Sequence, residues 1–169
     1  MQTITITNER DDIRELVKEE TSIIAKRRPA PPPLPHETTL QREELFNDLL
    51  ILDEENETMF NRLFQEAHAE VISRVNAKFI KETTTDVGDG DGNSVIILNM
   101  PDEWPIQYER SVGFKVRQFI VDYIVWRWLE GKSPGDAAMY FSRLDETVKD
   151  IQGLLNRWGR PLRRIPSFP

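Results

Sequence analysis

The chain has 169 residues, a length typical of one domain and sufficient to bury a substantial core. Its 29 acidic residues outnumber its 22 basic ones, and the formal net charge of −7 argues against a sequence-reading DNA-binding protein. The absence of cysteine excludes disulfides, thiolate metal sites and thiol nucleophiles. Aliphatic runs such as residues 95–98 are no longer than four residues, far shorter than the roughly 20 residues that span a bilayer, and the first residues lack the pattern of a signal peptide. We therefore expect a soluble protein that is made in the cytoplasm and has no membrane partner.

The N-terminal segment is expected to form a strand and then a helix. Residues 2–7 alternate threonine with isoleucine at the period of two that a half-buried strand needs. Asn8 can cap the following helix, which carries acidic residues in its first turn and should run to about Lys26. The apolar face of this helix comprises Ile13, Leu16, Val17, Ile23 and Ile24.

A proline-rich segment separates this region from the rest of the chain. Residues 29–35 contain five prolines, which forbid a helix and favour an extended polyproline conformation. We therefore expect residues 1–28 to form an arm that is held away from a body at residues 36–158. The basic residues ahead of the prolines also fit a ligand of aromatic-lined peptide-binding grooves, so a stiff spacer and a docking motif both remain open.

The first half of the body is expected to contain two helices and a β-hairpin. Residues 43–52 predict a short helix, and residues 57–81 predict a longer one because apolar residues recur there at steps of three and four. The turn-rich sequence DVGDGDGN then predicts a β-hairpin near residues 83–100, with its second strand at residues 94–100. The expected apolar side of the short helix comprises Leu45, Leu49 and Leu52.

The second half of the body predicts two long helices. One should run over residues 106–130 and end at Gly131, and the other should begin at Ser133 and end near Trp158. Their connection is short and their apolar residues recur at alternate steps of four and three, so we expect the two helices to pack against each other as an antiparallel pair. The predicted fold class is therefore mainly α: a helical bundle built on a long antiparallel αα-hairpin, with a small β-hairpin and an N-terminal strand-helix arm.

The chain offers little for catalysis or metal binding. The loop from Asp89 to Asn93 resembles the start of a calcium loop, but Met100 stands where the bidentate glutamate would be, so we expect a plain hairpin tip. His68 lies two residues from each of its acidic neighbours on a helix, and we expect it to be a surface or lightly buried residue. No phosphate-binding loop and no nucleophile–base pair can be assembled. We expect no catalytic residue, no metal, no cofactor and no enzyme.

Charge is distributed unevenly along the chain. Residues 36–70 hold ten acids against two arginines, a local charge of −8. The extended tail at residues 159–169 is basic, and beyond Asp150 the chain has four arginines and no acid. A solvated acidic face and a disordered tail would explain this distribution, and so would contacts between unlike ends of different molecules. The candidate acidic face comprises Glu43, Glu44, Asp48, Glu54, Glu55 and Glu57.

The order of elements over residues 54–158 resembles a known family. The helix DEENETMFNRLFQEAHAEVISRVNAKF precedes a hairpin, and the sequence VIILNMPDEWPIQYERSVGFKVRQFIVDYIVWRWLEGKSPGDAAMYFSRLDETVKDI follows. This order, with the aromatic patch Tyr123, Trp126 and Trp128 and a helix returning after a short turn, resembles the head–tail connector (adaptor) proteins of tailed bacteriophages and prophages. The N-terminal strand, helix and proline segment depart from the compact core of that family.

The resemblance implies a structural protein of the virion, located at the head–tail junction. It implies a homo-oligomeric ring, commonly of about twelve subunits, beneath the capsid portal and above a downstream tail or stopper protein. Double-stranded DNA would pass through the ring without sequence-specific binding, and the candidate acidic face would line the channel and keep the DNA sliding. A cytoplasmic helical adaptor that binds a partner through its proline-rich arm is the alternative.

Two further sets of residues are assigned on this basis. The helix over residues 106–130 is apolar nearly all round in its second half, so one face should contact a neighbouring subunit. The tail alternates arginines with apolar anchors, which suits docking into an acidic groove of the portal. The subunit interface comprises Phe114, Val121, Val125 and Trp128. The portal-binding tail comprises Arg157, Arg160, Leu162, Arg163, Arg164, Ile165 and Phe168.

Overall fold

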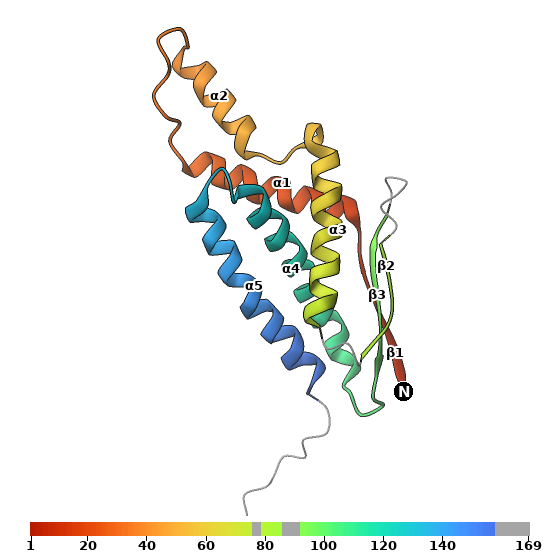
Figure 1. Ribbon diagram of the computed structural model, residues 1–169. Helices are drawn as coiled ribbons and strands as arrows, with labels where there is room; N and C mark the ends of the chain where they lie inside the picture. The colour runs from red at the N-terminus through yellow and green to blue at the C-terminus, as the bar shows by residue number, and fades with distance from the viewer. Residues whose placement is uncertain (76–78, 86–91, 158–169) are drawn as a thin grey trace, which may run out of the picture.

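A computed structural model describes residues 1–75, 79–85 and 92–157. The fold is mainly α-helical with a small antiparallel sheet, as the sequence predicts (Figure 1). The elements are β1 (Gln2–Asn8), α1 (Arg10–Arg27), α2 (Thr39–Leu50), the 3-10 turn η1 (Glu54–Asn56), α3 (Glu57–Arg74), β2 (Ile80–Thr85), β3 (Ser94–Met100), the 3-10 turn η3 (Ile106–Tyr108), α4 (Glu109–Leu129) and α5 (Pro134–Leu155). Among the described residues, no helix is both long and apolar enough to cross a membrane.

The sheet contains the N-terminal strand together with the two strands of the predicted hairpin. Its order is β1-β3-β2, and both pairings are antiparallel, so the N-terminal strand lies beside the second strand of the hairpin. In β1, Ile4 and Ile6 are buried, and their partners in β3 are Leu98 and Ile96. The threonines between them are exposed, as the period of two requires.

The α4–α5 pair is the antiparallel αα-hairpin that the sequence predicts, and these two helices make the most extensive contact between elements of the fold (Figure 1). Leu144, Ile151 and Leu155 of α5 are fully buried. The alternate steps of four and three also place Phe141 on the apolar side of α5, but its side chain is 45% exposed and the neighbouring Tyr140 is buried instead.

The helix α4 is the centre of the molecule. It packs against α5, α3, α1 and β1. Its second half is apolar nearly all round because these neighbours within the same chain cover it, and the partner expected from a second subunit is not needed there.

Residues 1–28 do not stand apart as an arm. The strand β1 pairs along its whole length with β3, and α1 packs against α4 with Ile13, Val17 and Ile24 in the core. The sequence prediction of a strand and a helix is confirmed, but their separation from the body is wrong. The residues after Arg28 carry the chain from the end of α1 back to α2, which packs on α1.

Two helix boundaries also differ from the prediction. The helix α2 begins at Thr39 rather than residue 43, because Thr38 and Gln41 form a reciprocal capping box. The helix α3 ends at Arg74 rather than residue 81, because Val75 adopts an extended conformation and the following β2 joins the sheet.

The apolar side predicted for the short helix is also corrected. Leu50 and Leu52 are buried, whereas Leu45 and Leu49 face the solvent. Phe46 and Leu50 provide the face of α2 that packs on the core.

Candidate interaction surfaces

Phe114 is the centre of a surface on the N-terminal half of α4. Its side chain is 65% exposed although it belongs to the central helix. A hollow of about 540 Å³ lies on one side, towards Leu154 and Arg157, and a second hollow of about 420 Å³ lies on the other side, towards Thr5 and Thr7 of β1. We call this surface, with Phe114 between its two hollows, the Phe114 groove.

Basic side chains surround the Phe114 groove. Arg110 and Arg117 both line it, and neither forms an ion pair with any other described residue. Lys115 pairs with Asp150 at 2.8 Å, and Glu109 is the remaining acid on the lining. The groove therefore combines an exposed aromatic ring with unpaired guanidinium groups, which suits an apolar and acidic partner.

Three of the four residues predicted for the subunit interface are in the core. Val125 is fully buried, and Val121 and Trp128 are also buried within the single chain. The indole N–H of Trp128 donates a hydrogen bond of 2.7 Å to the carbonyl oxygen of Leu50. The interface prediction is therefore wrong for these three residues, because neighbouring helices of the same chain cover that face of α4. Of these four residues, only Phe114 is exposed.

The helix α2 presents a second exposed apolar surface. Leu45 and Leu49 are 56% and 54% exposed, and the exposed Glu44 and Asp48 form the adjacent row on the same side of the helix. We call these four residues the acidic leucine face. Figure 1 shows α2 at one end of the molecule, beyond the bundle of α3, α4 and α5. No described residue of the chain covers the leucines of this face.

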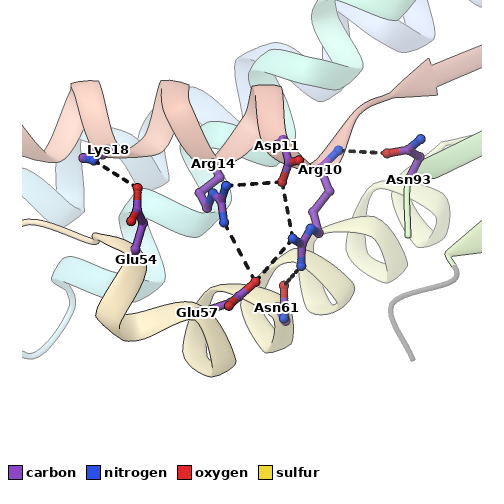
Figure 2. Close-up of polar contacts among 8 residues, drawn as sticks. All are labelled: Arg10, Asp11, Arg14, Lys18, Glu54, Glu57, Asn61 and Asn93. Atoms are coloured by element: carbon purple, nitrogen blue, oxygen red, sulfur yellow. Dashed lines mark hydrogen bonds and ion pairs between the residues drawn. The ribbon is translucent and has the colours of Figure 1, made fainter. Parts of the chain in front are cut away.

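The six acids of the candidate channel face fall into two groups. Glu43, Glu44 and Asp48 on α2 are exposed and have no ion pair among the described residues. Glu54 and Glu57, at the start of α3, face basic residues of α1 instead (Figure 2). Glu55 is exposed. The structure therefore does not bring the six acids together as one free acidic surface.

The contacts between α1 and α3 are centred on Arg10. Its guanidinium is buried and donates to Asn61 at 3.0 Å, and it lies 3.3 Å from carboxylate oxygens of Asp11 and Glu57 (Figure 2). Glu57 also pairs with Arg14 at 3.8 Å. Sequence reasoning missed this cluster because nothing in a single sequence indicates that α1 lies beside α3.

Asn93 caps α1 from a distant part of the chain. Its side-chain oxygen accepts a hydrogen bond of 3.1 Å from the backbone N–H of Arg10 (Figure 2). The predicted local cap, Asn8, belongs to β1 instead, and the cap position is Glu9, which makes no side-chain cap bond. Asp89 and Asp91, the other members of the calcium-like loop, lie outside the described residues.

A buried carboxyl group lies where α1, α4 and α5 meet. Burial, opposed by Arg143 and reinforced by Glu20, raises the pKa of Asp122 to about 6. The nearest Arg143 nitrogen is 4.0 Å from the carboxylate, and the other carboxylate oxygen has no hydrogen-bond partner among the described residues. The hydroxyl of Tyr140 donates to Glu20 at 2.5 Å, and burial followed by Glu20 raises the pKa of Tyr140. This cluster links α1 to the αα-hairpin.

His68 is buried, which corrects the prediction of a surface or lightly buried residue. Its Nδ1 lies 2.6 Å from the hydroxyl oxygen of Ser94, so it joins α3 to β3. Burial lowers its pKa, which favours the neutral ring. Within the part of the chain that the structure describes, no group of three or more histidine, aspartate or glutamate side chains is arranged to hold a metal ion.

The predicted portal-binding tail is described only at its first residue. Arg157 is exposed, and its guanidinium lies 5.3 Å from the centre of the Tyr108 ring. The other six residues of the tail lie outside the described residues.

Comparisons of the chain with protein-family models, with curated proteins and with solved structures give no match.

Proposed function

We propose that this chain is a structural virion protein that forms a homo-oligomeric ring and joins the capsid portal to the tail. The observation that carries the proposal is the presence of two exposed apolar surfaces, the Phe114 groove and the acidic leucine face, at separate places on one small chain. A subunit of a ring needs one surface for each of its two neighbours. The order of elements that resembles the connector family supports the same function.

The charge of α2 supports passage of DNA without binding. Glu43 is exposed and forms no ion pair with another described residue, so it could repel phosphate, and copies of the chain around a channel would add its field. Glu44 and Asp48 border the exposed leucines of the same helix and are equally placed to face a neighbouring subunit. Glu54 and Glu57 contribute less to such a field because basic residues of α1 partly neutralise them. The channel of the proposed ring would therefore be lined by fewer than the six acids predicted from the sequence.

The partners of the ring follow from the same proposal. The portal above it would receive the basic tail, and a tail or stopper protein would bind below it. Deleting residues 160–169 tests the portal contact: we expect a folded body with an almost unchanged melting temperature that no longer binds portal. Retained portal binding, or a salt-sensitive loss of DNA affinity instead, would contradict the role given to the tail.

A helical adaptor in the cytoplasm is the second candidate. Residues 31–36 are exposed and available to a peptide-binding groove. Arg28 fixes the start of this segment, because its guanidinium pairs with Asp136 of α5 at 2.7 Å. Under this candidate the protein acts as a monomer or dimer and binds through its prolines.

The mass of the purified protein separates the two candidates. Light scattering should give a value far above the 19.7 kDa of one chain, either alone or after portal is added, and an image of the assembly should show a ring. A mass of one or two chains in both conditions would exclude the ring and favour the adaptor.

A further inference from the structure

We infer that neighbouring copies of this chain bind head to tail, with the acidic leucine face of α2 on one copy seated in the Phe114 groove of the next. This inference rests on the proposed ring and names the surfaces that would build it. It concerns described residues only and requires neither the tail nor the proline segment.

The two surfaces are complementary in charge. Glu44 and Asp48 stand exposed without ion pairs on α2, and Arg110 and Arg117 stand without ion pairs on α4, within the described residues. Bringing these groups together would give each carboxylate a guanidinium partner, the pairing that allows two-point hydrogen bonding. Two copies of either surface would repel each other.

The two surfaces also match in their apolar groups. Leu45 and Leu49 lie one turn apart on the exposed side of α2, in the spacing by which an amphipathic helix enters a groove. Phe114 stands between the hollows of the groove and is 65% exposed. Seating the leucines against this ring would remove the largest exposed apolar groups of both surfaces from water.

The contact cannot form within one chain. The C-terminal end of α2 is fixed near the C-terminal end of α4 by the hydrogen bond from Trp128 to Leu50. Phe114 lies near the other end of α4, roughly 20 Å further along the helix at 1.5 Å per residue. Because the complementary surfaces lie at opposite ends of a rigid element, they can meet only between copies, and each contact leaves one free surface at each end. When the two surfaces of one chain engage two different neighbours, such contacts produce a ring or an open filament.

Charge reversal on each surface tests the contact. The groove variant Arg110→Glu/Arg117→Glu and the α2 variant Glu44→Arg/Asp48→Arg should each reduce the assembled mass to that of one chain, with unchanged circular dichroism. The control Lys26→Glu/Lys149→Glu places the same change in net charge as the groove variant on exposed residues that form no ion pair with described residues, and it should assemble like the wild type.

Restoration of the contact is the decisive result. A chain that carries both reversals again has opposite charges on its two surfaces, so it should assemble, as should an equal mixture of the two single-surface variants. Assembly of each single-surface variant at the wild-type level would overturn the inference and leave the proposed ring intact. Failure of both the double-surface chain and the mixture to assemble would also overturn it.

The wild type decides between failure of the inference and failure of the proposed function. A wild type that stays a single chain at about 1 mM and in the presence of portal overturns both. If the wild type assembles only with portal, the same variants are compared in that complex, with the same expected losses and recoveries. A groove variant that loses portal and keeps self-association would assign the groove to the portal and overturn the inference.

Discussion

The helices α1 and α2 are neighbours in the sequence and in space, but they relate to the core in opposite ways. The helix α1 buries Ile13, Val17 and Ile24 and is tied to α3 through Arg10. The helix α2 buries only Leu50, and three of its leucines are largely exposed. The segment after the prolines, expected to belong to the body, is thus the peripheral one, and the segment before them is part of the core. A proline-rich connection marks a break in the helix but does not say which side belongs to the core.

The largest expected difference between the two helices comes from placing a carboxylate on each. Val17→Asp buries a charge without a partner, so it should lower the free energy of unfolding by about 4 kcal/mol or more. Leu40→Asp, at a position of α2 that is 71% exposed, should change it by no more than about 0.5 kcal/mol. Urea denaturation of the two variants measures both values. Equal losses would remove the distinction between the helices.

The junction of α1 with the αα-hairpin should depend on pH through Asp122. The pKa of this carboxyl is about 6 in the folded protein against 3.8 in its reference state, so the folded state holds the proton more strongly. The resulting stabilisation is fully present below about pH 4 and is lost as the pH rises through about 6, with an upper limit of about 3 kcal/mol. The difference in free energy of unfolding between wild type and Asp122→Asn should therefore fall over this range.

A control separates this effect from the mere loss of a negative charge. Glu146→Gln removes a carboxylate from the exposed side of α5, and its comparison with wild type gives the background for Asp122→Asn. A difference between wild type and Asp122→Asn that stays constant, or rises, between about pH 4 and pH 7 would contradict the raised pKa.

The contact between α1 and α3 should depend on Arg10 more than on an arginine at the surface. Arg10→Met removes the hydrogen bonds of a side chain that is 7% exposed. We therefore expect chemical denaturation to show a free energy of unfolding that is lower by about 2 kcal/mol. Arg28→Met breaks the pair with Asp136, whose arginine is 40% exposed, and should cost less than about 1 kcal/mol. Losses in the reverse order would mean that α1 is held mainly at its C-terminal end.

Local pattern predicted the elements well where periodicity extends over many residues. The αα-hairpin, the strand at residues 94–100 and the N-terminal strand and helix all appear. The end of α3 was missed because Val75 and Phe79 are buried in the structure, as the helical stripe requires, although α3 ends at Arg74. Periodicity records burial and cannot tell by itself where a helix stops.

Contacts between distant segments account for the errors in the candidate sites. Val125 was placed in a subunit interface because its helix is apolar on several sides, yet α1 and α3 of the same chain pack against that helix. For Asn93 the sequence predicts only a place in a plain hairpin tip without a metal, and its role as the cap of α1 depends on a contact with a distant segment. Phe114 is exposed, and its role in a subunit contact stays a prediction. The partial neutralisation of Glu54 and Glu57 by α1 could not be foreseen without the placement of that helix.

The smallest expected effect tests whether α2 unfolds separately from the core. Thr38 accepts a hydrogen bond from the backbone N–H of Gln41, and the Gln41 side chain accepts one from the backbone N–H of Thr38. Thr38→Ala removes half of this capping box and should destabilise α2 by about 1 kcal/mol. Because α2 buries little apolar surface, we expect this loss as faster hydrogen exchange in its first turns, with the midpoint of global unfolding almost unchanged. Thr39→Ala, at the next position, is the matched control and should alter neither quantity. If Thr38→Ala instead lowers the free energy of global unfolding by the same amount, α2 and the core unfold as one unit. The two helices α1 and α2 would then differ only in how exposed their side chains are.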